Sequence, residues 1–323
     1  MSDMLEKKTG LEPRLLNLGC GSKTAPGWIN MDLVAAHPDV VAYDLRNGIP
    51  FDDEYFDAVY HAHFLEHISP EEAQGVLKEC FRVLKPGGVI RVVVPDLEML
   101  SRLYLEKLEA AVDGGMHTEE EYDWVVLNLI DQMVRKGNSQ RILDFIAHRD
   151  IDGSEFIMTF CSQQLLDYRA EQQSLRKQST EEANEADPGV KVALSERIKG
   201  KSLRDIWDYA LYRLEALIQP ARHSNHLMYK LKMFVLAAVM GKEAPKQYEM
   251  IKFLQTGEVH LWMYDRYSLS RLLAQIGFDN PVRKTAFDSQ IPDFHRYNLD
   301  VVGSKERKPD SLYVEATRSA GAG

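Results

Sequence analysis

The chain has 323 residues, of which 45% are hydrophobic and 27% are charged, and its net charge at pH 7 is -10. This length allows one large domain or two modest ones, and the composition is that of an ordinary globular protein. The acidic balance disfavours non-specific binding to nucleic acid or to an anionic membrane.

The longest apolar run, residues 233–240, is far shorter than the roughly 20 residues that span a bilayer. The first ten residues lack the apolar core of a secretory signal, so we expect a cytoplasmic protein. Its three cysteines, Cys20, Cys80 and Cys161, have no metal-ligand spacing, and we expect them to be reduced thiols.

The first predicted strand, Leu15–Leu18, runs directly into a glycine turn that contains Gly19 and Gly21. Glycines at a strand end let the backbone turn sharply and leave no Cβ in the way of a ligand. The next predicted strand, Trp28–Met31, ends at Asp32, where a carboxylate can accept hydrogen bonds from a ribose diol.

Asp32 follows Gly21 by only eleven positions, and Pro26 and Gly27 would break a helix between them. We therefore expect the first crossover helix to be short or absent. This argues against NAD as the ligand, because its pyrophosphate binds at a helix N-terminus.

Further predicted strands also end in polar residues. They are Val40–Tyr43 before Asp44, Phe56–Tyr60 before His61, and Val89–Val94 before Asp96. In an open α/β sheet, ligands bind at the carboxyl ends of the strands. Between the last two strands, Ser69 and Pro70 predict the start of a helix that ends before Gly87.

Taken together, these motifs resemble the class I S-adenosylmethionine-dependent methyltransferases, and most of all the type 11 group. The matching stretches are L-N-L-G-C-G at 16–21, the acids at 32 and 44, I-P-F-D-D-E-Y-F-D-A-V at 49–59, F-L-E-H-I at 64–68 and R-V-L-K-P-G-G at 82–88. The resemblance implies an α/β fold with a Rossmann-like sheet that is mostly parallel and has an antiparallel last strand. It covers about 1–98 and resumes near 258–316.

The resemblance also implies S-adenosylmethionine as the cofactor and a set of residues that hold it. These residues are Asn17, Gly19, Cys20, Gly21, Asp32, Asp44, Leu45 and His61. Asn17 stands where many relatives have an acid, so it can offer hydrogen bonds but no full negative charge.

Between the two matching parts, residues 99–257 form a predicted helical insertion that covers the active site and binds the acceptor. Predicted helices span 98–112, 118–136, 139–148, 162–178, 202–218, 226–240 and 245–255, with a mobile linker near 171–191. The apolar stretch 223–242 is either a core helix or a surface helix that rests on a membrane or on a lipid-linked acceptor.

After the insertion, residues 258–318 resume the core of the fold. A helix is predicted over Ser268–Ile276 with Gly277 as its cap, and strands over Asn280–Phe287 and Ser311–Thr317. We expect the tail, 319–323, to be disordered.

Methyl transfer from a sulfonium is an in-line displacement in which positioning supplies much of the catalysis. A hydroxyl acceptor also benefits from a general base, usually histidine. The catalytic candidates are His63, His67 and His260, with His61, Asp96 and Asp265 also near predicted strand ends. A packed structural role for His260 beside Trp262 is an equally good interpretation.

The run from His63 to His67 is related to a Glu-x-x-Glu-His motif that binds a divalent metal in small-RNA 2′-O-methyltransferases. Here His63 replaces the first acid, and the same Leu-Glu-His also occurs in metal-free type 11 enzymes. The sequence analysis therefore predicts no metal ligands.

We expect a methyltransferase that acts on a small molecule or glycan, at oxygen, with peripheral membrane contact possible and with no nucleic acid partner. One alternative is an RNA or protein methyltransferase. Another is a non-catalytic subunit that binds the cofactor and stabilises a partner enzyme.

Overall fold

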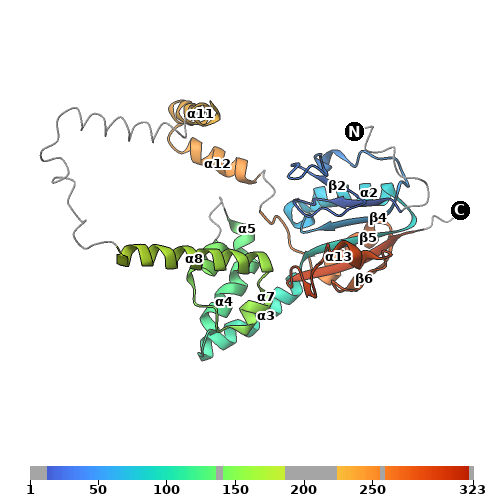
Figure 1. Ribbon diagram of the computed structural model, residues 1–323. Coiled ribbons are helices and arrows are strands. Elements are labelled where there is room, and N and C mark those ends of the chain that lie inside the picture. The colour runs from blue at the N-terminus through green and yellow to red at the C-terminus, as the bar shows by residue number, and fades with distance from the viewer. Residues whose placement is uncertain (1–12, 136–140, 186–223, 255–258, 320–323) are drawn as a thin grey trace, which may run out of the picture. The chain divides into compact units, whose positions relative to one another are not determined.

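The structure is a computed structural model that describes residues 13–135, 141–185, 224–254 and 259–319 (Figure 1). The chain divides into two compact units, one made of residues up to 168 together with those from 257 onward, the other of residues 169–256. The expected insertion, 99–257, is thus divided between the two units rather than forming one of them.

The first unit contains a seven-stranded sheet with the order β3-β2-β1-β4-β5-β9-β6. The strands are β1 (Leu15–Leu18), β2 (Trp28–Asp32), β3 (Val40–Ala42), β4 (Phe56–Ala62), β5 (Leu84–Pro95), β6 (Phe278–Lys284) and β9 (Ser311–Arg318). Strands β1 to β5 pair in parallel, whereas β9 runs antiparallel to both β5 and β6. The expected sheet of a class I methyltransferase is confirmed.

Both faces of the sheet are covered. On one face, helices α2 (Pro70–Val83) and α13 (Arg266–Ile276) bury their apolar sides against the core. On the other face, residues of the 286–301 segment pack on the sheet, among them Phe294 in the short helix η6 (Phe294–Tyr297). Because all four residues of β1 are buried, this strand has no alternation of apolar and polar residues.

Helix α2 begins as its sequence predicts. Ser69 and Glu72 form a reciprocal capping box in which each side chain accepts the other's backbone N–H, and Pro70 occupies the first turn. After the helix, β5 starts at Leu84, five residues earlier than predicted. The Pro86–Gly88 stretch lies inside an irregular part of the β4–β5 ladder, so its glycines form a bulge rather than a separate turn.

Residues 19–27 contain no helix, which confirms the expected loss of the first crossover helix. Helix α13 starts at its N-cap Asp265 and ends at Gly277 in the left-handed conformation, as the glycine predicted. Before α2, the chain also forms the short helices η1 (Leu45–Asn47), which follows β3, and η2 (Leu65–His67), which follows β4.

The rest of the first unit is helical. A small second core forms around Trp124 and Ile146. The helices of this region are α3 (Leu97–Asp113), α4 (Thr118–Val126), η3 (Leu127–Asp131), α5 (Gln132–Val134), α6 (Arg141–His148) and α7 (Glu155–Phe160). The periodicity of the sequence did not indicate α7, which is too short to show a repeated apolar face. A two-stranded hairpin, β7 (Val301–Val302) and β8 (Lys305–Glu306), precedes β9.

Helix α8 (Gln163–Glu185) continues through most of the stretch predicted as a linker. This correction has a local cause: residues 171–185 include four glutamates and three glutamines and contain neither proline nor glycine, so they favour a helix. The end of the expected linker, 186–191, and the predicted helix 202–218 lie outside the described residues.

The second unit also contains α11 (Ser224–Met240) and α12 (Ala244–Leu254). Among the described helices, none combines the length and the apolar character that crossing a bilayer requires.

Candidate active site

The glycine turn after β1 depends on its two glycines. Gly19 and Gly21 have φ angles of 59° and 53°, a region that residues with a Cβ rarely adopt. A Cβ on Gly19 would also lie 2.6 Å from the ring of Phe64, whereas one on Gly21 would meet no atom within 4 Å. The turn therefore leaves open space beside Gly21 at the carboxyl edge of the sheet.

Asp32 at the end of β2 faces this turn. Its Oδ2 accepts a 2.8 Å hydrogen bond from the backbone N–H of Gly21, and its Oδ1 accepts one of 3.1 Å from Val34. Within the described part of the chain, no lysine, arginine or histidine forms an ion pair with this carboxylate. Each oxygen has capacity for a further donor, as binding of a ribose diol requires.

Two other residues that were predicted to hold the cofactor, Asn17 and Cys20, lie on the buried side of the glycine turn. Asn17 is buried, and its amide donates to the carbonyl of Lys23 and to Oδ1 of Asn30, both at 2.9 Å. It therefore holds the far end of the turn instead of presenting its N–H groups to a ligand. The thiol of Cys20 is buried, and desolvation together with nearby Asp32 raises its pKa to about 12, so it is no nucleophile at neutral pH.

Asp44 lies at the end of β3, where it caps η1. Its carboxylate forms two hydrogen bonds, of 2.9 and 2.8 Å, with Nε and Nη2 of Arg46. Hydrogen bonding to this guanidinium lowers the pKa of Asp44. The next residue, Leu45, is buried in the core. The carboxylate thus already has a partner, which leaves it less available for a ligand than that of Asp32.

His61 on β4 lies beside Leu18 of β1 and is fully buried. Neither ring nitrogen has a hydrogen-bond partner within the described part of the chain, and the ring packs edge-on against Phe64 at 5.8 Å. Burial lowers the pKa of His61 to about 4, so the imidazole is neutral at physiological pH. Buried polar atoms without partners are uncommon and mark a place for a bound group or an ordered water.

The remaining predicted histidines meet around Glu66 in η2. Nδ1 of His63 lies 3.1 Å from Oε1 of Glu66, and its Nε2 lies 2.9 Å from Oγ of Ser311. His63 has a φ of 51°, an unusual conformation for a non-glycine residue that the two hydrogen bonds help to hold. Glu66 is fully buried and its pKa is raised by desolvation to about 8.

His260 reaches this cluster from the chain that returns after the insertion. The backbone N–H groups of Leu261 and Trp262 both donate to the carbonyl of Glu66, and that of His260 donates to Gln132. The rings of His67 and His260 then lie 4.8 Å apart, edge to face. Burial lowers the pKa of His67 to about 4 and that of His260 to about 2, so both imidazoles are neutral.

The two acids considered beside the histidines have structural roles. Asp96 accepts from the N–H of Met99 as the N-cap of α3 and pairs with Arg283 at 3.1 Å. Asp265 caps α13. In contrast, sequence reasoning missed Ser311, whose position at the start of β9 gives no local sign of its contact with His63.

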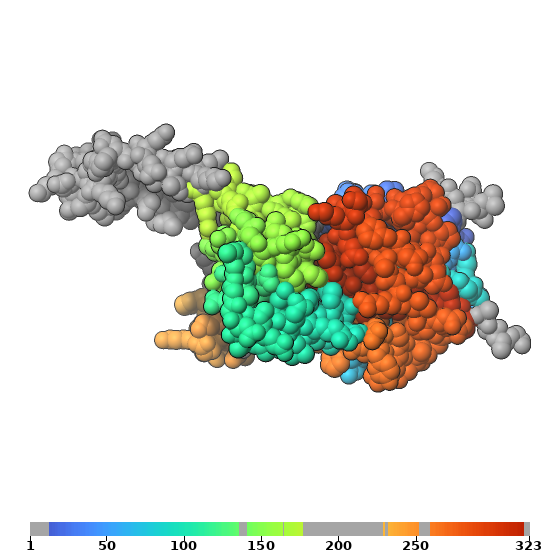
Figure 2. Space-filling view, turned by 90° about the horizontal axis from the view of Figure 1, so that it is seen from below, coloured from blue at the N-terminus to red at the C-terminus, as the bar shows by residue number. Residues whose placement is uncertain are grey.

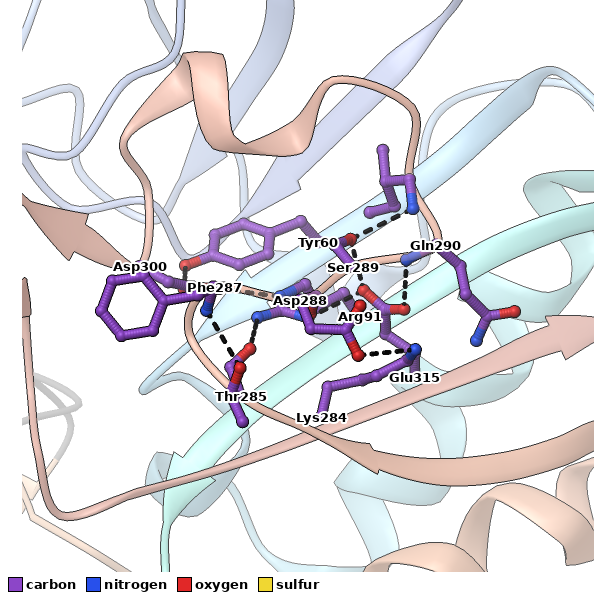
Figure 3. A network of polar contacts seen from close by, with 11 residues as sticks. Tyr60, Arg91, Lys284, Thr285, Phe287, Asp288, Ser289, Gln290, Asp300 and Glu315 are labelled. Atoms are coloured by element: carbon purple, nitrogen blue, oxygen red, sulfur yellow. Dashed lines mark hydrogen bonds and ion pairs between the residues drawn. The ribbon is translucent and has the colours of Figure 1, made fainter. Parts of the chain in front are cut away.

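A buried ion network supports the segment that leads to Ser311 (Figure 3). Tyr60, Arg91 and Glu315 lie side by side on β4, β5 and β9. Arg91 donates to Oδ2 of Asp300 at 2.7 Å and to Oε1 of Glu315 at 2.8 Å, while the hydroxyl of Tyr60 donates to Oδ1 of Asp300 at 2.6 Å. Further bonds from Arg91 to the carbonyls of Thr285 and Asp288 fix the rest of this segment on the sheet.

A cavity of about 650 Å³ lies between α7, the first residues of α8 and the β7–β8 hairpin. Figure 2 shows the face on which the green helices of the insertion adjoin the orange and red surface of residues 259–319. Met158, Gln163, Phe287 and Arg307 are among the residues that line the cavity. Arg307, which lines the cavity, is also one of the charges that lower the pKa of His63.

Comparison with known proteins gives a match to a family described as "Methyltransferase domain", over residues 16–92. A demethylmenaquinone methyltransferase from Staphylococcus epidermidis is 30% identical over 139 residues, which cover 40% of this chain and 54% of that protein. The chain thus spans about half the length of the curated relatives that it matches.

Two solved structures resemble shorter parts of the chain. An S-adenosylmethionine-dependent methyltransferase from Archaeoglobus fulgidus is 24% identical, with 29% of this chain and 51% of that chain covered and a TM-score of 0.22. A protein from Pyrococcus horikoshii is 26% identical, with 32% and 58% covered and a TM-score of 0.24.

Proposed function

We propose that this chain transfers a methyl group from S-adenosylmethionine to an oxygen of a small-molecule or sugar acceptor, since residues 16–92 match a family described as a methyltransferase domain. The observation that carries the proposal is the contact between the glycine turn and Asp32, with Gly21 N–H 2.8 Å from Oδ2. It sets a carboxylate beside a backbone without side chains at the carboxyl edge of a parallel sheet, where ligands bind in this architecture.

In this proposal, the cofactor lies across the ends of β1, β2 and β4. Asp32 accepts hydrogen bonds from the ribose hydroxyls, and the space beside Gly21 admits the amino acid part of the cofactor. Leu45 offers an apolar surface next to the adenine, whereas Asp44 flanks it while bound to Arg46. His61, whose ring nitrogens have no partner among the residues that the structure describes, gains one when the cofactor or a water arrives.

S-Adenosylmethionine, when bound, supplies a methyl group on a positively charged sulfur. The residues of this chain then need to hold the acceptor in line with that methyl group and to accept the proton that a hydroxyl acceptor loses. His63, His67 and His260 are the proposed bases, because each neutral imidazole keeps a lone pair, but burial lowers their pKa values and so makes them weak bases. The cavity of about 650 Å³ has a size that suits a small acceptor.

A second candidate acceptor is an isoprenoid quinol methylated at a ring carbon, as the name of the Staphylococcus epidermidis relative suggests. One feature of the second unit favours a lipid-like acceptor: Phe234, Val239 and Met240 on α11 are each more than two-thirds exposed. Lys232 and Lys242 nearby would suit anionic headgroups.

The test is to incubate the purified chain with S-adenosylmethionine that carries a deuterated methyl group and with a panel of sugars, small hydroxyl compounds and a demethylated quinol. Formation of S-adenosylhomocysteine and of a product heavier by one labelled methyl group identifies the acceptor. Fragmentation then separates O-methyl from C-methyl products. The non-catalytic alternative would be favoured if the chain binds the cofactor but methylates no acceptor, even when candidate partner proteins are present.

A further inference from the structure

Glu66, His67 and His260 each direct a possible ligand atom into one space, with these three atoms within 4.8 Å of one another. We infer that this cluster binds a divalent transition-metal cation, contrary to the absence of metal ligands that the sequence analysis expected. Ligands about 2.1 Å from a shared cation lie roughly 3.3 Å apart in tetrahedral geometry, so the side chains would close by roughly 1.5 Å at most.

The hydrogen bonds of the cluster leave lone pairs free for a cation. Nδ1 of His67 lies 3.2 Å from the carbonyl of Val259, to which it can only donate, so its Nε2 keeps a lone pair. Oε2 of Glu66 and Nδ1 of His260 are buried and have no hydrogen-bond partner within the described part of the chain. Two buried groups therefore lack the partner that a cation would supply, and the half-buried His67 offers a third lone pair.

Surrounding residues hold the three side chains as the outer contacts of metal sites do. Histidine ligands usually donate their second ring N–H to a carbonyl, as His67 does to Val259. His63 can donate from Nδ1 to Oε1 of Glu66 and accept from the hydroxyl of Ser311 at Nε2, which orients the carboxylate. The backbone bonds from Leu261 and Trp262 to Glu66 fix the distance between η2 and the segment that carries His260.

Two imidazoles and one carboxylate favour zinc, manganese, iron or cobalt over calcium or magnesium, which prefer sites made of oxygen alone. Charged neighbours have opposite effects on cation binding. The positive charges of Lys308 and Arg135 disfavour it, whereas the carboxyl group of Asp310 favours it. A site with three protein ligands keeps at least one position open, as catalytic rather than structural zinc sites do.

The open position gives the cation a function that rests on the proposed methyl transfer. With the lone pairs of His67 and His260 on the cation, these two residues would no longer act as bases. An acceptor hydroxyl bound at the open position would lose its proton to a water molecule more readily, because a divalent cation lowers the pKa of a coordinated hydroxyl. Its oxygen would then form the bond to the methyl group as the bond between that methyl group and the sulfur breaks, and S-adenosylhomocysteine would leave. The acceptor class that follows is a compound with a hydroxyl group, and most simply one with a second oxygen that can also reach the cation.

The direct test is calorimetric titration of the chelator-treated full-length chain with manganese chloride and, separately, with zinc chloride. We expect about one cation per chain, with at least about tenfold weaker binding in His67→Ala, His260→Ala and Glu66→Gln. His295→Ala is the matched control, because His295 is exposed on η6 and belongs to no part of the site. It should bind the cation like the wild type.

Two further measurements keep the inference falsifiable if a variant fails to fold. Cobalt added to the wild type should give the visible absorption of a cation with nitrogen ligands, whereas the spectrum of the hydrated ion would overturn the inference. Calorimetry with S-adenosylhomocysteine checks each variant: retained cofactor binding with lost cation binding supports the metal site. No cation binding in a wild type that binds the cofactor, or cation binding that survives His67→Ala with His260→Ala, would refute the metal site alone.

Discussion

The backbone N–H of Gly21 donates a 2.8 Å hydrogen bond to Oδ2 of Asp32, and so joins the turn after the first strand to the end of the second. This contact brings a pair of glycines and one acid together in the surface that we propose binds the cofactor. The short turn also lets Asn17 hold Lys23 and Asn30, so the surface is fixed before a ligand arrives. Fixed geometry of this kind lowers the entropy cost of binding.

Gly19→Ala should destabilise the chain and weaken cofactor binding. Alanine at this position would have to adopt a left-handed backbone conformation, and its Cβ would lie 2.6 Å from the ring of Phe64. We expect a loss of about 2–3 kcal/mol in the free energy of unfolding, measured by urea denaturation. Gly75→Ala is the control, since Gly75 is exposed in α2 and its Cβ would meet nothing within 4 Å. That change should stabilise the chain by up to about 1 kcal/mol.

Arg91→Met should cost about 3–5 kcal/mol, because it leaves Asp300 and Glu315 buried without their cation. Arg91→Lys should recover only part of this loss, since one ammonium cannot reproduce the four bonds that the guanidinium donates. Denaturant unfolding measures both. The exposed pair of Arg46 and Asp44 provides the comparison, and Arg46→Met should cost at most about 1 kcal/mol. Equal losses in the two arginine-to-methionine variants would contradict this account.

His61 should make the chain sensitive to acid. Its pKa is lowered from 6.5 to about 4, so the unfolded chain binds a proton at this residue before the folded chain does. The stability that follows from this difference is present above pH 6.5 and is lost as the pH falls toward 4, with a total of about 3 kcal/mol. His61→Leu should therefore flatten the fall in unfolding free energy between these pH values. The same slope in both proteins would show that His61 does not contribute to it.

Local chemistry explains what the sequence predicted well. Ser69, Pro70 and Gly277 mark helix ends through their own backbone and side-chain preferences. Pro26, which follows the glycine turn closely, predicted that the first crossover helix is short or absent. The resemblance to class I methyltransferases then predicted a mostly parallel sheet with an antiparallel last strand. The glycine turn and Asp32 could be found this way because they lie only eleven positions apart.

Long-range contacts explain what could not be predicted. Arg91 was visible as a charge in an apolar strand, but its partners Asp300 and Glu315 lie 209 and 224 positions away. In the same way, His67 meets His260 only because the returning chain pairs with the carbonyl of Glu66. Residues 171–185 are strongly polar, which predicts a linker, although the absence of proline and glycine among them favours the helix that they form.

The most direct test of the central claim is calorimetric titration of the purified chain with S-adenosylhomocysteine, run beside Asp32→Asn. The amide keeps a carbonyl oxygen for the N–H of Gly21 but removes the charge and one acceptor for the ribose hydroxyls. The account predicts binding near micromolar strength in the wild type, about -8 kcal/mol, and at least about tenfold weaker binding in the variant, with His295→Ala unchanged. No binding in the wild type, or equal binding in Asp32→Asn, would contradict the assignment of this turn as the cofactor site.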